Sequence, residues 1–537
     1  MGPGQDIQLS HAFDATMRSI GPRPRLPWHV QHSGPSHTFR WLSTSSTSDR
    51  PLVPLWISGE AVTSSSGGTT SVRHSKTRRE SCEVVLAGKE ETTRAIRESR
   101  RAFVSWRDVS GWERKAILSK ALILLRDRFP EFTTALRADA AWSDLLIHAD
   151  QSSAVNITDG AAQTAISIEG TIPQTIDGSL TMVTREPYGP VLSVPAFNYP
   201  LTLALRSIVY PLACGNTVIL KSSPLTPQFS HLFGPLFAEA GLPPGVLQIL
   251  NLSEEDVAER VEQIISDDDV RMVNFTGSVK LGRILAEKCG KYLKPSVMEL
   301  GGKAPAIVLP SADLELAANN ILFGAFVNSG QVCMSTERVI VHDDIAEQFE
   351  RVLRETAEQV KWSGGMEFVR PGAVDGAQAL IDDALKEGAR IIYSASSDSS
   401  SSSSSAFAPT ILASVPPSAA LSTTESFSPI LILQTASSIS SLIDLANSHD
   451  TGLTSSIFSQ DLSQALEVAK RLEIGAVHIN GMTIHDQHGL PHGGWKASGW
   501  GRFNGQGAIE SFTQTKNVRI IKGGGGKLPL EMLYGGL

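Results

Sequence analysis

The sequence predicts a large α/β fold built on parallel β-sheets. Its 537 residues are enough for several domain-sized units and a sizeable core. Short apolar runs alternate with amphipathic helical stretches through most of the chain, at the spacing of strand–helix–strand units. Hydrophobic residues make up 41% of the chain, which is typical of a globular protein. The formal net charge of −8 gives no electrostatic reason to bind nucleic acid or an anionic membrane.

The cysteine count excludes a disulfide scaffold and points to a reducing compartment. The four thiols are widely separated, at Cys82, Cys214, Cys289 and Cys333. None forms a CxxC pair, so a zinc site of four thiolates is not expected. The most apolar stretch, residues 190–220, is interrupted by prolines and polar residues, and it favours buried strands and turns over a membrane span.

The first fifty residues differ in composition from the rest of the chain. They are rich in Ser, His, Pro and Arg, and residues 16–48 contain four arginines and no acidic residue. This composition resembles a mitochondrial transit peptide, whereas Asp6, Asp14 and the prolines argue against one. We therefore expect residues 1–50 to be a disordered extension of a cytoplasmic protein, with mitochondrial targeting as the alternative.

Helical periodicity begins near Ala87 and is followed by a predicted parallel sheet. Strand-forming residues at 180–184 precede a Pro-Tyr-Gly-Pro turn. The predicted strands are Val191–Val194, Thr217–Leu220, Leu247–Leu250, Met272–Phe275 and Ala306–Leu309. The predicted helices are Glu91–Trp106, Gly111–Phe129, Leu201–Ala213, Gln228–Ala240, Asp256–Ile265 and Lys280–Cys289.

A second α/β block is expected from about residue 301 to residue 499. Its predicted helices are Asp344–Lys361 and Gly376–Glu387, and its predicted strands are Arg390–Tyr393, Leu431–Leu433 and Gly475–Asn480. A run of serines, Ser399–Ser405, cannot pack a core and predicts a mobile surface loop between two strands. The glycines at 523–526 predict a flexible joint near the end of the chain.

Two glycine-containing motifs carry possible chemistry. Gly277 and Ser278, followed by Gly282, join a strand to a helix, where backbone amides suit a pyrophosphate. The same pattern also occurs in ordinary turns. Glu299 lies between an apolar run and two glycines, which predicts either a strand end or a buried carboxylate with a raised pKa, and such a carboxylate is a general base near neutral pH.

Two further residues are candidates for covalent catalysis. Cys333 follows Gly330, and the residues after it look helical, so the thiol is predicted at a helix N-terminus that lowers its pKa. A lone cysteine is, alternatively, a small buried hydrophobe. Asn198 lies between two prolines after a predicted strand, where its amide either forms a turn or donates to a developing oxyanion.

The order of these motifs resembles that of the aldehyde dehydrogenase superfamily over about residues 55–520. The most specific segments are FTGSVKLG, MELGGK and GQVC, and Cys333 follows Glu299 by 34 positions. The late segments HINGMTIHD and LPHGGWKASGWGRFN also match, and they look most like the branch of salicylaldehyde and vanillin dehydrogenases. The resemblance implies an aromatic or other bulky apolar aldehyde as substrate.

The resemblance implies a division of the chain into three parts. Residues 51–165 and 188–299 would form a Rossmann-like cofactor-binding domain, and residues 300–500 a catalytic α/β domain. Residues 166–187 and 501–537 would supply an oligomerisation hairpin and a C-terminal strand. The expected assembly is a homodimer or a homotetramer.

The resemblance also implies NAD(P)-dependent oxidation of an aldehyde to its carboxylic acid. Cys333 would form a thiohemiacetal and then a thioester, Asn198 would hold the oxyanion, and Glu299 would activate the hydrolytic water. The implied cofactor-binding residues are Lys221, Gly277, Ser278, Gly282, Leu300, Glu425 and Phe427. NAD is the expected cofactor and no metal is needed. NADP stays possible, because Pro224 stands where the family usually carries a glutamate.

Two alternative functions stay open at this point. A CoA-acylating relative would not need the hydrolytic glutamate, so the presence of Glu299 argues against it. A non-catalytic paralogue would keep the fold alone. The intact set of Asn198, Glu299 and Cys333 argues against that alternative. Pro224 argues for it, as does the small residue Ala196 near the position before Asn198, where the family usually carries Trp.

Overall fold

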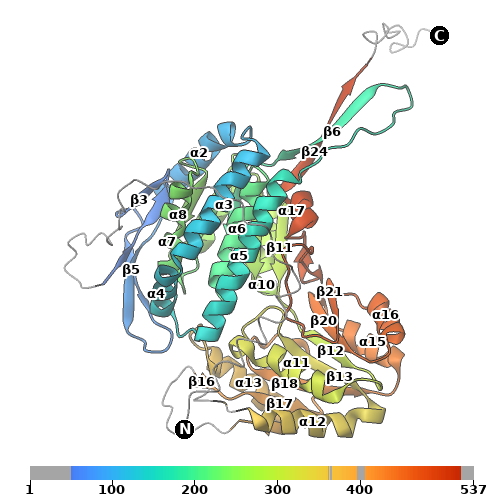
Figure 1. Ribbon diagram of the computed structural model, residues 1–537. Helices are drawn as coiled ribbons and strands as arrows, with labels where there is room; N and C mark the ends of the chain where they lie inside the picture. Colours follow the sequence, from blue (N-terminus) through green and yellow to red (C-terminus); the bar gives the residue numbers. More distant parts are fainter. Residues whose placement is uncertain (1–49, 361, 363–365, 396–405, 522–537) are drawn as a thin grey trace, which may run out of the picture. The chain divides into compact units, whose positions relative to one another are not determined.

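The computed structural model describes residues 50–360, 362, 366–395 and 406–521, and these contain two large β-sheets with helices on their faces (Figure 1). The predicted α/β fold with parallel sheets is confirmed. The expected N-terminal extension, the serine run and the glycine-rich joint near the C-terminus lie outside the described residues.

The first sheet has eight strands and contains all of the strands predicted between residues 191 and 275. In sheet order they are β23 (Gly499–Trp500), β11 (Ser296–Leu300), β10 (Met272–Gly277), β7 (Pro190–Val194), β8 (Thr217–Lys221), β9 (Leu247–Leu250), β2 (Leu55–Ile57) and β3 (Glu60–Val62). The five strands from β11 to β9 are parallel, and the other three are antiparallel to their neighbours. The carboxyl ends of five parallel strands therefore meet at one edge, where open α/β sheets bind ligands.

Helices cover this sheet and enclose the largest hydrophobic core. They are α2 (Lys89–Trp106), α3 (Gly111–Asp127), α4 (Phe129–Asp139), α5 (Asp144–Ile166), α6 (Pro200–Ala213), α7 (Pro227–His231), α8 (Phe233–Ala240), α9 (Val257–Ser266), α10 (Val279–Lys291) and α17 (Gly505–Phe512). The helix predicted over 228–240 is two helices, because the amide of Leu232 bonds to the carbonyl of Phe229, three residues back, and ends α7 there.

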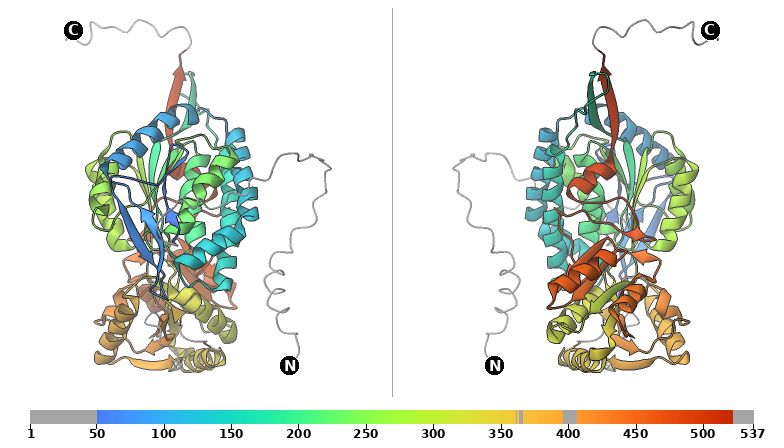
Figure 2. Two further views of the ribbon diagram at one scale, coloured as in Figure 1. Left: turned by 90° about the vertical axis from the view of Figure 1, so that its left-hand side faces the viewer. Right: turned by 90° about the vertical axis from the view of Figure 1, so that its right-hand side faces the viewer.

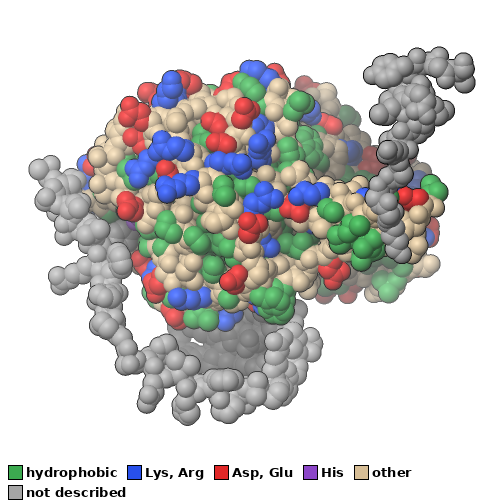
Figure 3. Space-filling model, turned by 90° about the horizontal axis from the view of Figure 1, so that it is seen from above, with side chains coloured by type: hydrophobic (Ala, Val, Ile, Leu, Met, Phe, Trp, Pro, Cys, Tyr) green, Lys and Arg blue, Asp and Glu red, His purple; other side chains and the backbone are tan. Residues whose placement is uncertain are grey.

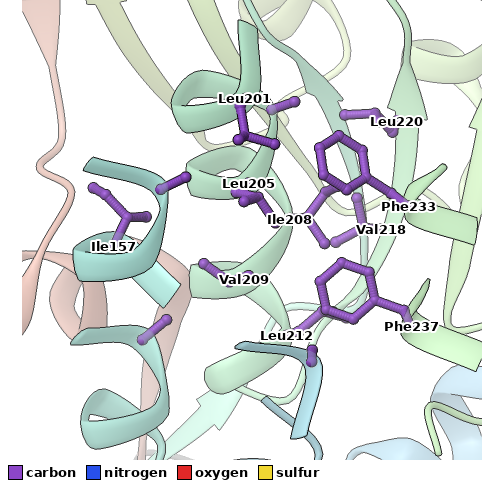
Figure 4. Close-up of a cluster of buried hydrophobic side chains, with 14 of the residues drawn as sticks. Ile157, Leu201, Leu205, Ile208, Val209, Leu212, Val218, Leu220, Phe233 and Phe237 are labelled. Atoms are coloured by element: carbon purple, nitrogen blue, oxygen red, sulfur yellow. The ribbon is translucent and has the colours of Figure 1, made fainter. Parts of the chain in front are cut away.

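Helix α6 is the central element of this core, and every one of its residues is buried. Leu205 and Ile208 on α6 face Val218 on β8 and the ring of Phe233 on α8 (Figure 4). On its other side α6 packs against α5, which contributes Ile157 (Figure 4). A helix that is apolar all round is buried all round, so a charged residue within it must have a partner inside the protein.

The second sheet has seven strands, six of them parallel. In sheet order they are β15 (Arg390–Ser394), β17 (Thr410–Ala413), β18 (Ile430–Ala436), β13 (Thr336–His342), β12 (Ala304–Val308), β20 (Thr454–Phe458) and β21 (Ala476–Ile479). Its helices are α11 (Leu314–Phe326), α12 (Ala346–Gln359), α13 (Ala373–Lys386), α14 (Ala420–Thr423), α15 (Ile439–Asn447) and α16 (Leu462–Arg471). Only β15 is antiparallel to its neighbour. The strand predicted at Ala306–Leu309 corresponds to β12. The prediction grouped it with the strands of the first sheet, but it belongs to this second sheet.

A two-stranded antiparallel arm projects from the body. Strand β6 (Leu180–Pro187) pairs along its whole length with β24 (Thr513–Ile520), which joins segments more than 300 residues apart (Figures 1 and 2). Side chains of the arm such as Leu180, Val518 and Ile520 are exposed. On the face seen from above, acidic and basic side chains are intermingled with hydrophobic ones (Figure 3).

Three small sheets complete the described structure. They are β1 (Leu52–Val53) with β5 (Glu80–Val85) and β4 (Thr69–Arg73), β14 (Met366–Glu367) with β16 (Ala406–Phe407), and β19 (Thr451–Gly452) with β22 (Trp495–Lys496). Within the described ranges, no helix combines the length and the apolarity that crossing a bilayer requires.

Candidate active site

The loops that carry Asn198 and Cys333 come from different sheets and are hydrogen-bonded to each other. Asn198 follows β7 of the first sheet, and Cys333 precedes β13 of the second. The Asn198 side-chain amide donates to the carbonyl of Gln331 at 3.0 Å, and the Asn328 amide donates to the Asn198 carbonyl at 2.9 Å. These two bonds hold the Asn198 amide against the segment that ends in Cys333.

The segment before Cys333 has an unusual backbone. Asn328, Ser329 and Gly330 all have positive φ, at 52°, 58° and 69°. A Cβ on Gly330 would lie 2.2 Å from the carbonyl oxygen of Ser428, so only glycine fits there. The predicted helix N-terminus at Cys333 is wrong, because the chain turns directly into β13. The left-handed residues, and not a helix, present the thiol.

Glu299, the next-to-last residue of β11, is a buried carboxylate, but its predicted raised pKa is wrong. Burial raises the pKa, but the positive charge of Arg206, together with smaller contributions from His492 and Cys333, outweighs burial and lowers the pKa of Glu299 to about 2. One guanidinium nitrogen of Arg206 donates to Glu299 Oε2 at 2.8 Å, and both side chains are buried. Glu299 is therefore ionised at every pH near neutrality.

Three further side chains complete the buried cluster around Arg206 and Glu299. Asp486 Oδ2 lies 3.4 Å from Arg206 Nη1, and the guanidinium carbon is 4.3 Å from the centre of the Phe503 ring. His492 Nε2 lies 3.7 Å from Glu299 Oε1. Arg206 is thus balanced by two carboxylates, which is what a guanidinium inside α6 requires.

The Cys333 thiol is half-buried and is neutral in this state. Burial raises its pKa well above the ordinary value, and the negative charge of Glu299 raises it further, whereas Arg206 opposes the shift. The other three cysteines are buried. In the described part of the chain, Cys333 is therefore the thiol that a substrate can reach.

Replacing Arg206 by methionine is expected to change the pH dependence of the reaction. Without the guanidinium, the largest contribution that opposes burial is lost, and the pKa of Glu299 rises. An acidic limb, with activity rising as the pH rises through that pKa, should then appear in the pH profile of kcat. The wild-type profile should lack this limb above pH 3. The buried carboxylate left without its partner should also lower the free energy of unfolding by about 3–5 kcal/mol, which denaturant unfolding measures.

The lowered pKa of Glu299 makes the stability of the fold depend on pH in a definite direction. In the wild type the pKa of Glu299 is lower in the folded state than in the unfolded state, so this group stabilises the fold above the unfolded pKa. That contribution is lost as the pH falls toward 2. An Arg206→Met profile with no new acidic limb would contradict the assignment of Arg206 as the group that holds Glu299 ionised.

Several predicted cofactor residues lie at the carboxyl edge of the first sheet. Lys221 ends β8, and burial lowers the pKa of its ammonium to about 8. Gly277 ends β10, and Ser278 caps α10 by accepting from the amide of Leu281 at 3.3 Å. The first turn of α10 has no acidic residue, so its positive end is open to an anion.

Gly282 and Leu300 form a packing contact between α10 and β11. A Cβ on Gly282 would lie 2.5 Å from a methyl carbon of Leu300. A larger residue at 282 would have to displace the Leu300 side chain or move the start of α10 away from the sheet. The structure thus gives Gly282 a packing role that brings the N-terminus of α10 close to the strand that ends with Leu300.

Glu425 and Phe427 lie on a loop that a buried ion pair fixes. Glu425 Oε1 accepts from the amide of Gly302 at 3.2 Å, and burial followed by the charge of Glu337 raises the Glu425 pKa to about 8. The Glu337 carboxylate accepts from the amide of Phe427 at 3.0 Å and from Lys303 Nζ at 2.5 Å. The loop therefore lies directly over the turn that follows Glu299.

Sequence reasoning missed Arg206, Asp486 and His492 as parts of the site. Arg206 is one of the residues that interrupt the apolar stretch 190–220, and a charge inside an otherwise apolar helix is the signal that could have found it. Its partners Glu299 and Asp486 are 93 and 280 residues away in the chain. No local pattern links residues at such separations.

The residues present fit a nicotinamide dinucleotide, the cofactor that the resemblance implies. The nearly buried Lys221 ammonium has no hydrogen-bond partner in the part of the chain that the structure describes, although Glu254 is close enough to influence its charge. The open N-terminus of α10 suits a pyrophosphate. The rings of Phe197, next to Asn198, and Phe427 meet edge to face with centres 6.2 Å apart.

Comparison with known proteins gives matches over most of the chain. The model of the aldehyde dehydrogenase family matches residues 62–518. Vanillin dehydrogenase of Pseudomonas fluorescens is 38% identical over 482 residues, which cover 88% of this chain and 98% of that protein. The crystal structure of a salicylaldehyde dehydrogenase from Pseudomonas putida G7, complexed with salicylaldehyde, has a TM-score of 0.85 and 32% identity, over 89% of this chain and 99% of that one. An NAD-dependent aldehyde dehydrogenase from Sinorhizobium meliloti has a TM-score of 0.84 and 27% identity, over 89% and 96% of the two chains.

Proposed function

Because the chain belongs to the aldehyde dehydrogenase family, we propose that Cys333, Glu299 and Asn198 convert an aromatic aldehyde to its carboxylic acid. The protein is an oxidoreductase that oxidises aldehydes with a nicotinamide cofactor. The observation that carries the assignment of residues is the hydrogen bond from Asn198 to Gln331, two residues before the thiol. It supports an amide donor beside the nucleophile, near the carboxyl end of β11, where Glu299 is the next-to-last residue.

The first step is attack of the Cys333 sulfur on the aldehyde carbon, in which the thiol S–H bond breaks and its proton passes by way of the neighbouring Glu299 carboxylate to water. The carbonyl oxygen becomes an oxyanion, and the Asn198 amide and the Cys333 backbone N–H donate to it. The bound cofactor supplies the hydride acceptor. The acyl group is then held on sulfur as a thioester, and Glu299 takes a proton from the water that hydrolyses it. Arg206 holds the carboxylate ionised and ready for that proton.

The cofactor would lie along the carboxyl edge of the first sheet. Lys221 would contact the adenine ribose, and Ser278 with the first turn of α10 would contact the pyrophosphate. Glu425 and Phe427 would hold the nicotinamide ribose and ring. Pro224 lacks an acidic side chain that would repel a 2′-phosphate, so NADP is proposed as a second, weaker cofactor beside NAD.

An aromatic substrate is proposed from the relatives. Proteins similar to this chain over most of its length are named for vanillin and salicylaldehyde. The aromatic pair of Phe197 and Phe427 near the Cys333 loop is consistent with a flat substrate.

We propose that the two sheets have the separate roles that the resemblance implies. The first sheet and its helices would bind the cofactor, and the second would carry the nucleophile. The arm of β6 and β24 exposes Leu180, Val518 and Ile520, and we propose that it joins subunits of a homodimer or homotetramer in the cytoplasm.

Reduced-nicotinamide absorbance with a panel of aldehydes tests the proposed function. We expect turnover with benzaldehyde-type substrates and NAD, slower turnover with aliphatic aldehydes, and no requirement for CoA. A reaction that proceeds only when CoA is present would identify the acylating alternative. Absence of turnover with every aldehyde and both cofactors would support the non-catalytic alternative and overturn the proposal.

A further inference from the structure

The second oxygen of the Glu299 carboxylate faces an imidazole nitrogen without a hydrogen bond. Arg206 donates a hydrogen bond to Glu299 Oε2, while Glu299 Oε1 lies 3.7 Å from His492 Nε2. In the described residues, both Oε1 and Nε2 are buried and have no hydrogen-bond partner. A carboxylate oxygen and an unprotonated ring nitrogen are both acceptors, so no bond forms between them until one proton is added.

The other ring nitrogen of His492 faces a second carboxylate. His492 Nδ1 lies 4.0 Å from Asp486 Oδ1, which also accepts from the Asn504 amide at 2.7 Å. A neutral ring that carries its proton on Nδ1, toward Asp486, leaves Nε2 as an acceptor toward Glu299. The ring thus stands between two carboxylates, with its two nitrogens directed to one each.

Exposure increases along this row of three groups. The side chains of Glu299, His492 and Asp486 are 1%, 6% and 14% exposed, respectively. Hydrolysis of each thioester leaves one proton on Glu299, the most buried of the three. The proton must leave before the next turnover, and the row leads from the buried carboxylate toward solvent.

We propose that His492 takes the proton from Glu299 after thioester hydrolysis and, with Asp486, passes it toward solvent. This inference rests on the proposed function and deepens it, since it assigns the fate of the proton at the same site. His492 acts through Glu299 and does not touch the substrate, so it is a positioning and relay residue.

The step balances in protons and electron pairs. The water oxygen bonds to the acyl carbon while one water O–H bond breaks and its proton goes to Glu299 Oε1. The carbon–sulfur bond breaks, and its electron pair stays on the Cys333 sulfur as a thiolate. Glu299 then gives its proton to His492 Nε2, while the Nδ1 proton moves to Asp486 and from there to solvent water. The ring returns to its starting tautomer when a proton exchanges from Nε2 to Nδ1 through solvent, and the Cys333 thiolate takes a proton from water to return to its neutral resting form.

Charged and titratable groups from several elements face this ring. Arg206 on α6 stabilises the carboxylate form of Glu299, so a proton on Glu299 is readily given up, and its other nitrogen lies 3.4 Å from Asp486 Oδ2. His478 on β21 also lies near the ring, but burial, followed by the charge of His485, lowers the His478 pKa to about 4 and keeps it neutral near pH 7. Apart from the Cys333 sulfur, which also contacts the carboxylate, His492 is therefore the group in this cluster, among the described residues, that is placed to accept the proton from Glu299.

Ester hydrolysis without any cofactor tests the relay separately from aldehyde oxidation. p-Nitrophenyl acetate acylates a thiol nucleophile and releases p-nitrophenolate, and water must then hydrolyse the acetyl thioester. In His492→Phe we expect the initial burst of p-nitrophenolate to stay at roughly one per Cys333. Steady-state release should fall about 10- to 100-fold, less than the loss of a direct acid–base group.

Two further variants exclude a merely structural effect. His492→Gln keeps a polar side chain but cannot relay a proton, so its steady rate should fall as in His492→Phe. In His492→Ala, added imidazole should restore the steady rate in proportion to its concentration, and the rescue should follow the neutral fraction of imidazole as the pH changes. His485→Gln, an exposed position on the same loop, is the matched control and should keep the wild-type rate.

The outcomes separate the relay from the proposed function. A normal burst with an unchanged steady rate in His492→Phe and His492→Gln would overturn the relay and leave the function intact. Full activity of His492→Gln, or no imidazole rescue of a folded His492→Ala, would also overturn it. Loss of the burst and of aldehyde oxidation in the wild-type protein would overturn the proposed function itself.

Discussion

Cys333→Ala is expected to lose aldehyde oxidation by at least about 10⁴-fold, because covalent attack has no other thiol to use. The loss should appear both in the pre-steady-state formation of reduced nicotinamide and in steady turnover. Substrate binding should change little, since the thiol is small and half-buried. Stopped-flow absorbance at saturating aldehyde measures both phases.

The matched control for this variant is Cys289→Ala. Cys289 is buried on α10, and burial raises its pKa to about 11, so it serves packing and not chemistry. We expect that variant to keep wild-type kcat with somewhat lower thermal stability. Wild-type turnover in Cys333→Ala, with intact folding by circular dichroism, would refute the covalent mechanism.

Glu299→Gln is expected to separate the two halves of the reaction. Glutamine keeps the shape of the side chain and can still accept a hydrogen bond from Arg206, but it cannot take a proton from water. Acylation should therefore proceed once, giving a burst of reduced nicotinamide close to the enzyme concentration. Steady turnover should fall about 10²- to 10⁴-fold, the usual contribution of a general base.

Mass spectrometry provides an independent readout for Glu299→Gln. The trapped thioester should appear as an added acyl mass on the peptide that contains Cys333. Arg206 keeps Asp486 as a partner in this variant, so the fold should persist, and thermal unfolding checks it. Steady turnover equal to the wild type would show that another group activates the water.

The parallel strands were predictable because each is a continuous apolar run between turn residues. Strand β9 has the same bounds as its prediction, Leu247–Leu250, and all four of its residues are buried. Helix α5 escaped prediction although it is the longest described helix. Its buried face includes Asp150, Gln151 and Thr158, which mask the apolar periodicity. Asp150 is placed there to accept from the first amides of α6, a tertiary role that local patterns do not show.

The site was predictable as a set of residues but not as an electrostatic environment. Asn198 and Glu299 both lie at the carboxyl ends of parallel strands, as their positions after apolar runs indicated. The pKa of Glu299 depends on Arg206, which a different part of the chain supplies from α6. Burial favours a raised value, and only the folded contact reverses it.

The protonated state of Cys333 bears on how the enzyme survives oxidative conditions. Peroxide attacks thiolates and hardly reacts with thiols, so a cysteine that stays neutral at rest is slow to form sulfenic acid. Burial and the negative charge of Glu299 thus shield the nucleophile between turnovers. The period of greatest vulnerability is the moment after the acyl group has left, when sulfur carries the charge. An enzyme that is idle for lack of substrate should therefore outlast one that is cycling in the same concentration of peroxide.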